Sequence, residues 1–136
     1  MKAKKLLPVL FAILALVISI MACNFGGEPG ASNFYMATDE SGETKTTVYS
    51  STDEFFVFFD VNAIEPGTQF EARWYILDYE GEDPNTPFET INYAYEEGTS
   101  QIYFQLTSDS EWPASRYRVE VFMNDAKVGE QQFSVE

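Results

Sequence analysis

The chain has 136 residues, a length that suits one domain, and its 22 Asp and Glu against 8 Lys and Arg give a formal net charge of -14. Such an acidic chain is not expected to bind nucleic acid, because binding to phosphates requires clustered cations. The chain has no histidine and a single cysteine, which excludes histidine-based triads, Cys/His zinc sites and c-type haem attachment.

The first 22 residues have the composition of an export signal. Three lysines among the first five residues precede an almost uninterrupted apolar run over 6–22, which ends in Ile20-Met21-Ala22-Cys23. This ending resembles the lipobox of bacterial lipoprotein precursors, in which an aliphatic residue and a small residue precede the cysteine that is modified. Met21 departs from the small or aliphatic residue that usually lies between them.

The resemblance implies a lipid anchor. In that family the cysteine thiol receives a diacylglycerol, the chain is cleaved before it, and the new amino terminus is usually acylated. We therefore expect a signal peptide over 1–22, a lipidated Cys23 that begins a flexible tether over 23–32, and a domain over 33–136 held on the extracytoplasmic side of the cell membrane. Two alternatives are a membrane-spanning signal anchor, since a run of about 17 apolar residues nearly spans a bilayer, and a conventional signal peptide that leaves a free thiol.

From residue 33 onward the pattern is that of short strands. Runs of β-branched and aromatic residues alternate with Gly, Pro, Asn and Asp about every 10 residues, and no convincing helical period follows Cys23. We expect a hairpin turn over 39–43, a turn at Pro66-Gly67, an acidic loop over 78–87 and a turn at Asn124-Asp125. The expected strands cover 33–38, 44–50, 54–61, 70–76, 88–95, 101–107, 116–123 and 127–135.

Seven or eight short strands with hairpin-length connections predict an antiparallel β-sandwich. The period of two along each strand assigns one set of side chains to the core. The positions expected to face inward are Phe55, Val57, Phe59, Val61, Phe70, Ala72, Trp74, Ile76, Ile102, Phe104, Leu106, Tyr117, Val119, Val121, Met123, Phe133 and Val135.

The C-terminal part resembles the last two strands of an immunoglobulin-like domain. The resemblance rests on the segment from Trp112 to Val121, on Asn124-Asp125, and on Phe133-Ser134-Val135. It implies that Tyr117, two residues before a buried valine, is a tyrosine corner, and that Trp74 is the buried tryptophan of the third major strand. The two cysteines of antibody domains are replaced, by Val57 or Phe59 on one side and by Val119 on the other. Immunoglobulin-like and fibronectin-like topologies both remain open.

Candidates for chemistry are few, and we expect neither an enzyme nor a cofactor. A glycosidase needs only two carboxylates, but 22 acidic residues single out no pair. The acidic loop offers weak calcium ligands, although their spacing is not that of an EF-hand and solvated surface charge is the simpler interpretation. The weak calcium candidates are Asp78, Glu80, Glu82 and Asp83.

Aromatic residues on predicted outward faces are the better candidates for function. Exposed rings on a sheet bind partner proteins or stack on sugars, unless the register differs or a neighbouring segment covers them. The candidate binding surface consists of Phe56, Phe58, Tyr75, Tyr93, Tyr103 and Phe122, and Tyr79 also falls on an outward face.

Two functions are compatible with this surface. One is an anchored interaction module that docks a protein partner by a sheet face or strand edge. The alternative is a carbohydrate-binding or substrate-capture lipoprotein that serves a transporter or a secreted hydrolase. The residues considered for sugar binding are Tyr75, Asn92, Tyr93 and Tyr103.

Overall fold

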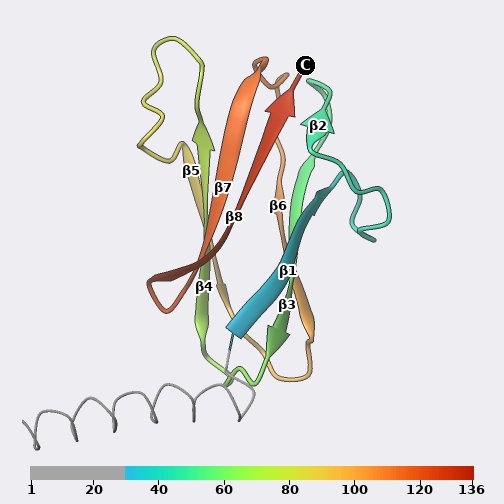
Figure 1. Ribbon diagram of the computed structural model, residues 1–136, viewed down its shortest axis with the longest axis vertical. Coiled ribbons are helices and arrows are strands. Elements are labelled where there is room, and N and C mark those ends of the chain that lie inside the picture. The colour runs from blue at the N-terminus through green and yellow to red at the C-terminus, as the bar shows by residue number, and fades with distance from the viewer. Residues whose placement is uncertain (1–29) are drawn as a thin grey trace, which may run out of the picture.

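Two sheets packed face to face make up residues 30–136, the part of the chain that the computed structural model describes (Figure 1). One sheet has the strand order β1-β3-β6, and the other has the order β2-β8-β7-β4-β5. The fold is all-β, as the sequence predicts, and no helix of residues 30–136 could span a membrane. The predicted signal peptide and the predicted lipidation at Cys23 lie outside the described residues. The strands are β1 (Gly30–Ala37), β2 (Val48–Tyr49), β3 (Phe55–Asn62), β4 (Gln69–Ile76), β5 (Glu89–Ala94), β6 (Gln101–Leu106), β7 (Ser115–Met123) and β8 (Ala126–Val135).

The expected hairpin over 33–50 forms only near its turn. The first predicted strand is confirmed as β1, whereas the second, expected over 44–50, is reduced to the two residues of β2. The backbone N–H of Thr38 donates to the carbonyl of Thr44 at 3.1 Å, but residues 48–49 then pair in parallel with β8 of the other sheet. This change of sheet places the ring of Tyr49 in the core, where its hydroxyl donates to the carbonyl of Ala37 at 2.8 Å. Burial of a large aromatic side chain therefore outweighs continuation of the hairpin. β1 also begins at Gly30, within the expected tether.

Turns are the local features that the sequence predicts best. Asn124 and Asp125 both have left-handed φ angles, 48° and 70°, and join β7 to β8 in a two-residue loop. Asparagine and aspartate tolerate this conformation, which matches the twist of a hairpin. At the expected Pro66-Gly67 turn, the glycine has a φ of 91°. Both predicted turns are confirmed.

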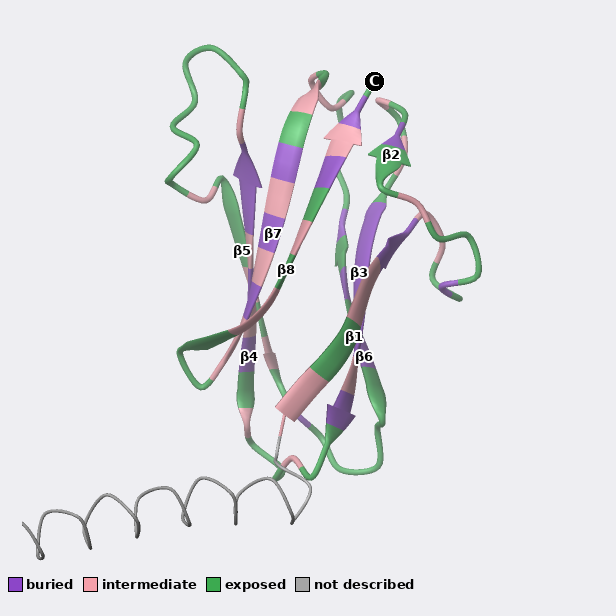
Figure 2. Ribbon diagram, viewed as in Figure 1, coloured by how far each residue is buried: buried purple, intermediate pink, exposed green. Residues whose placement is uncertain are grey.

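The core consists of aromatic and branched side chains from the inner faces of both sheets. Buried and exposed residues alternate along β6, and Figure 2 shows the alternation of buried and half-buried residues along β7. Every position expected to face inward is buried except Met123, which is half-buried. Phe55 lies in the part of the core nearest to loop 107–114, and its ring contacts those of Tyr49, Trp74, Trp112, Tyr117 and Phe133.

The described chain enters the sandwich at one end, and two of its loops lie at the other. Gly30, the first described residue, pairs with Asn62, which is the last residue of β3. The described chain therefore begins at the end of the sandwich where β3 ends. Phe55, the first residue of β3, pairs with Leu106, and loop 107–114 follows directly. Loops 77–88 and 107–114 therefore lie at the end opposite the start of β1 (Figure 1).

A close contact between β1 and β8 closes one side of the sandwich. A Cβ atom on Gly129 would lie 2.4 Å from the ring of Phe34, which stacks on Phe59 with ring centroids 5.0 Å apart. Because the Phe59 ring limits how far the Phe34 ring can move, we expect Gly129→Ala to lower the free energy of unfolding by about 1–3 kcal/mol. Urea unfolding measures this change. In a Phe34→Ala background the same substitution should cost nothing, and an equal cost in both backgrounds would contradict this explanation.

Candidate functional site

The predicted outward aromatic residues of the three-stranded sheet are not exposed. Phe56 and Phe58 do face away from the main core, but each is only 2% exposed and belongs to a second buried cluster. The turn after β1 and the Tyr35 ring of β1 cover Phe58: a Cβ on Gly42 would lie 3.2 Å from the Phe58 ring, and the Tyr35 ring stacks on it at 5.1 Å. Phe56 packs beside Phe58 and Tyr103. The expectation of exposure is therefore wrong for both residues. Tyr103 remains exposed at their side and donates to the Glu40 carboxylate at 2.8 Å.

The outer face of the five-stranded sheet is covered by its own charged side chains. The Arg118 guanidinium lies 4.3 Å from the centre of the Tyr75 ring, and the Arg73 guanidinium lies 3.9 Å from that of Phe122. Tyr75 is buried and Phe122 is half-buried as a result. Long cationic side chains thus shield these rings from water, so the expected exposure of Tyr75 is also wrong.

The four residues considered for sugar binding do not meet at one place. Tyr93 and Tyr103 line a shallow groove of about 240 Å³ at the edges of β5 and β6, together with Thr99, Gln101 and Ile102. Tyr75 lies on the outer face of the other sheet, and Asn92 pairs with Glu71 on that face. The structure brings together two of the four.

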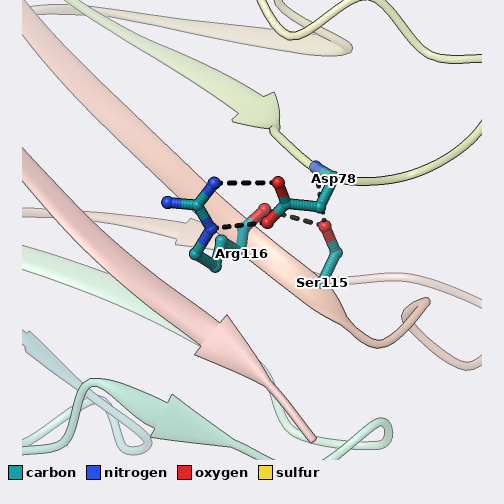
Figure 3. Close-up of polar contacts among 3 residues, drawn as sticks. All are labelled: Asp78, Ser115 and Arg116. Atoms are coloured by element: carbon teal, nitrogen blue, oxygen red, sulfur yellow. Dashed lines mark hydrogen bonds and ion pairs between the residues drawn. The ribbon is translucent and has the colours of Figure 1, made fainter.

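The carboxylates of the acidic loop do not converge on a cation site. Asp78 accepts from the Nε and Nη2 atoms of Arg116 at 2.6 and 2.8 Å, and these bonds hold the pKa of Asp78 below its usual value (Figure 3). Asp83 accepts from the backbone N–H of Asn85 and the hydroxyl of Thr86, which also lowers its pKa. Within residues 30–136 no three acidic, histidine or cysteine side chains are placed to hold a metal. The structure does not support the calcium hypothesis for Asp78, Glu80, Glu82 and Asp83.

An aromatic pocket, here called the end pocket, opens at the end of the sandwich formed by loops 77–88 and 107–114. Its volume is about 160 Å³. Three rings pack against one another in it: the centroids of Phe88, Trp112 and Tyr117 lie 6.2–6.4 Å apart. The lining residues are Ile76, Tyr79, Glu82, Phe88, Trp112, Pro113 and Tyr117.

The floor of the end pocket is fixed to the core. The Trp112 ring stacks on Phe55 at 4.5 Å, and its Nε1 atom donates to the carbonyl of Asp53 at 2.9 Å. The Tyr117 hydroxyl donates to the carbonyl of Pro113 at 2.6 Å, a tyrosine corner that confirms the prediction for this residue. Because both rings are held by a hydrogen bond as well as by packing, the floor is preorganised for a ligand.

The rim of the end pocket gathers exposed apolar side chains. Four large apolar side chains of residues 30–136 are at least 36% exposed, namely Val48, Tyr79, Phe88 and Tyr103, and two of these four line the end pocket. Sequence reasoning placed Tyr79 on an outward face but missed Phe88 and Trp112. Each of these two residues lies beside a proline shortly before a strand begins, Phe88 before β5 and Trp112 before β7. Only the fold brings the beginnings of these two strands together.

The tyrosine corner makes stability sensitive to alkaline pH. Burial raises the pKa of Tyr117 to about 12, whereas an unfolded tyrosine ionises near pH 10. The stabilising contribution is therefore complete below about pH 10 and is lost as the pH rises toward about 12. Tyr117 alone is expected to lower the free energy of unfolding by about 1–2 kcal/mol between about pH 9 and pH 11. Burial also raises the pKa of Tyr49, which adds a further loss over the same range, and urea unfolding of the wild type measures the sum. Tyr117→Phe should show a shallower fall, and an unchanged fall would contradict this assignment.

Comparisons with known proteins address the fold. No family model matches the sequence, and no curated protein resembles it significantly. An immunoglobulin-like protein from Pseudomonas aeruginosa superposes with a TM-score of 0.59 at 17% identity, over 80% of this chain and 97% of that one. An alkylpurine DNA glycosylase from Pseudomonas fluorescens gives a TM-score of 0.48 at 11% identity, over 88% of this chain and 33% of that one. The first of these similarities and the buried core together establish an immunoglobulin-like β-sandwich.

Proposed function

We propose that this protein is a lipid-anchored, non-catalytic module of the cell surface whose end pocket binds a protein partner. The observation that carries the proposal is the end pocket itself: a rigid aromatic floor with two exposed apolar side chains, Tyr79 and Phe88, at its rim. Small clusters of this kind, with aromatic side chains in a preorganised depression, are typical anchors of protein interfaces.

The position of the end pocket supports this function. With Cys23 as the anchor, the tether reaches the sandwich at the start of β1. The loops that carry the lining residues of the end pocket lie at the opposite end (Figure 1). The pocket would then point away from the membrane, toward partners in the envelope or outside the cell. The acidic domain would also be repelled by anionic lipid headgroups.

The composition of the end pocket favours binding over catalysis. Glu82 is the one ionisable carboxylate among its lining residues, and hydrolysis of glycosides by the usual mechanism requires a pair. The two tyrosines of the pocket are not paired with a base among the lining residues. A lone carboxylate without a second paired acid or base supports recognition over acid–base catalysis.

A matched pair of double variants tests the proposal. Of the four exposed large apolar residues, Tyr79 and Phe88 line the end pocket, whereas Val48 and Tyr103 lie elsewhere. The test variant is Tyr79→Ala/Phe88→Ala, and the control variant is Val48→Ala/Tyr103→Ala. We expect affinity capture from the native envelope to recover one partner protein with the wild type and with the second variant, and to lose it with the first. Equal capture by both variants would contradict a role for the end pocket.

A second candidate function rests on the groove at β5 and β6. Its lining of Tyr93, Tyr103, Thr99 and Gln101 combines rings with hydrogen-bonding groups, as sugar-binding sites do. In that case Tyr103→Ala would abolish retention on immobilised envelope glycans, whereas Tyr79→Ala/Phe88→Ala would not. The opposite pattern would eliminate the carbohydrate function.

A further inference from the structure

We infer that the group that docks in the end pocket is a basic side chain, arginine or lysine, presented by a cationic segment of the partner protein. The inference rests on the proposed function and specifies the chemistry of the same site. It follows from the aromatic lining, the charge around the pocket and the size of the pocket.

The lining of the end pocket suits an organic cation. The faces of aromatic rings carry negative charge density, and tryptophan and tyrosine attract ammonium and guanidinium groups most strongly. Tyr79, Phe88 and Trp112 supply three accessible rings above the buried Tyr117, while Ile76 and Pro113 can contact an aliphatic stem. The same protein already combines rings and guanidinium groups at Arg73–Phe122 and Arg118–Tyr75.

The charge at the rim is negative and uncompensated. Glu82 lines the end pocket, and neither Glu82 nor Glu80 forms an ion pair within residues 30–136. Asp78 is already bound by Arg116, so it does not compete for an incoming cation. A carboxylate beside aromatic faces is the combination that binds a basic side chain through both charge and ring contacts.

None of the five cationic side chains of residues 30–136 occupies the end pocket. Lys45 lies over the Tyr35 ring, and the other four each have a carboxylate partner. With a net charge of -14, the whole molecule attracts a basic partner and raises its rate of association.

The size of the end pocket fits one side chain. Pockets for whole drug-sized ligands span roughly 300–1,000 Å³, whereas the end pocket measures about 160 Å³. A single arginine or lysine side chain that inserts from a flat interface matches this volume better than a whole drug-sized ligand does. Together with the proposed protein partner, this size assigns the pocket to one side chain of an exposed basic segment.

Two peptides that have the same shape but differ in charge distinguish electrostatic attraction from shape complementarity. The probes are acetyl-Gly-Arg-Gly-amide and its citrulline analogue, which replaces the guanidinium with a neutral urea. They are titrated into the ¹⁵N-labelled full chain in neutral detergent micelles. The indole N–H of Trp112 reports on the end pocket, and that of the fully buried Trp74 reports on the integrity of the fold. We expect saturable shifts at Trp112 alone, with the arginine peptide binding about fivefold more tightly than the citrulline peptide.

Two variants with the same change of net charge complete the test. Glu82→Gln should weaken binding of the arginine peptide about threefold and leave the citrulline peptide unaffected. Glu65→Gln, at the opposite end of the sandwich, should change neither. Equal affinity for both peptides, or no binding by either, would overturn the inference of a basic ligand. Equal affinity would still be compatible with the proposed function, whose own test is the comparison of the two double variants.

Discussion

Replacing Phe55 with alanine is expected to lower the free energy of unfolding by about 3–5 kcal/mol. The side chain is fully buried, and its ring joins both sheets: it contacts Tyr49 next to β8, Trp74 on β4 and Trp112 beneath the end pocket. The substitution leaves a cavity that these rigid rings cannot close, so the loss includes packing as well as transfer from water. Because small domains are stable by only about 5–15 kcal/mol, this one change removes a large share of the total.

Phe88→Ala is the matched control for this prediction. It removes the same side chain from a site that is 36% exposed, so we expect a smaller loss of about 1–2 kcal/mol. Urea unfolding of the full chain in micelles, followed by tryptophan fluorescence, measures both. If Phe55→Ala is unfolded from the start, Phe55→Leu provides a milder loss of about 1–2 kcal/mol. Similar losses at positions 55 and 88 would contradict the role of Phe55 as a fully buried contact between the two sheets.

Cys23→Ala is expected to abolish lipid attachment completely. The acyl group is joined through the cysteine sulfur, and the chain has no other cysteine. In a bacterial host we expect the wild type to begin at residue 23 with added acyl mass, and the variant to keep residues 1–22. The wild type would carry acyl chains and the variant would keep the apolar leader, so both would partition into detergent. Intact mass spectrometry distinguishes the two forms.

The wild-type mass also separates the alternatives to a lipid anchor. An unmodified chain that keeps residues 1–22 would mean that the leader spans the membrane. An unmodified chain cleaved at another position would mean that the protein is secreted without an anchor. Either result would contradict lipidation at Cys23, and the immunoglobulin-like fold of residues 30–136 would be unaffected.

Local pattern was sufficient to predict most of the fold. Alternation of side chains identifies the inner face of a strand because the period of two is fixed by backbone geometry. Trp74 and Tyr117 could be placed from motif spacing, and the hydrogen bond from Tyr117 to Pro113 confirms the second. The Asn124-Asp125 turn could be predicted because few residues adopt its conformation.

Contacts between distant segments could not be predicted in this way. Phe56 and Phe58 lie on the face of β3 opposite the core, where a period of two predicts exposure. The turn after β1 nevertheless lies against Phe58, and both rings are buried in a second cluster. Tyr75 is covered by an arginine of a strand more than 40 residues later in the chain. The end pocket depends on which strand ends meet, so Phe88 and Trp112 became recognisable as partners only in the folded chain. Registers and loop paths of this kind are set by tertiary packing.

Photo-crosslinking in the native cell tests the central claim, that the end pocket is where a protein partner docks. A benzoylphenylalanine residue at position 79 is compared with the same residue at position 103; both sites are exposed tyrosines, and only the first lies at the end pocket. We expect a single crosslinked protein from position 79, none from position 103, and a weaker crosslink from position 79 when Glu82→Gln is added. Crosslinks from position 103 alone, or equal crosslinks from both positions, would contradict the account.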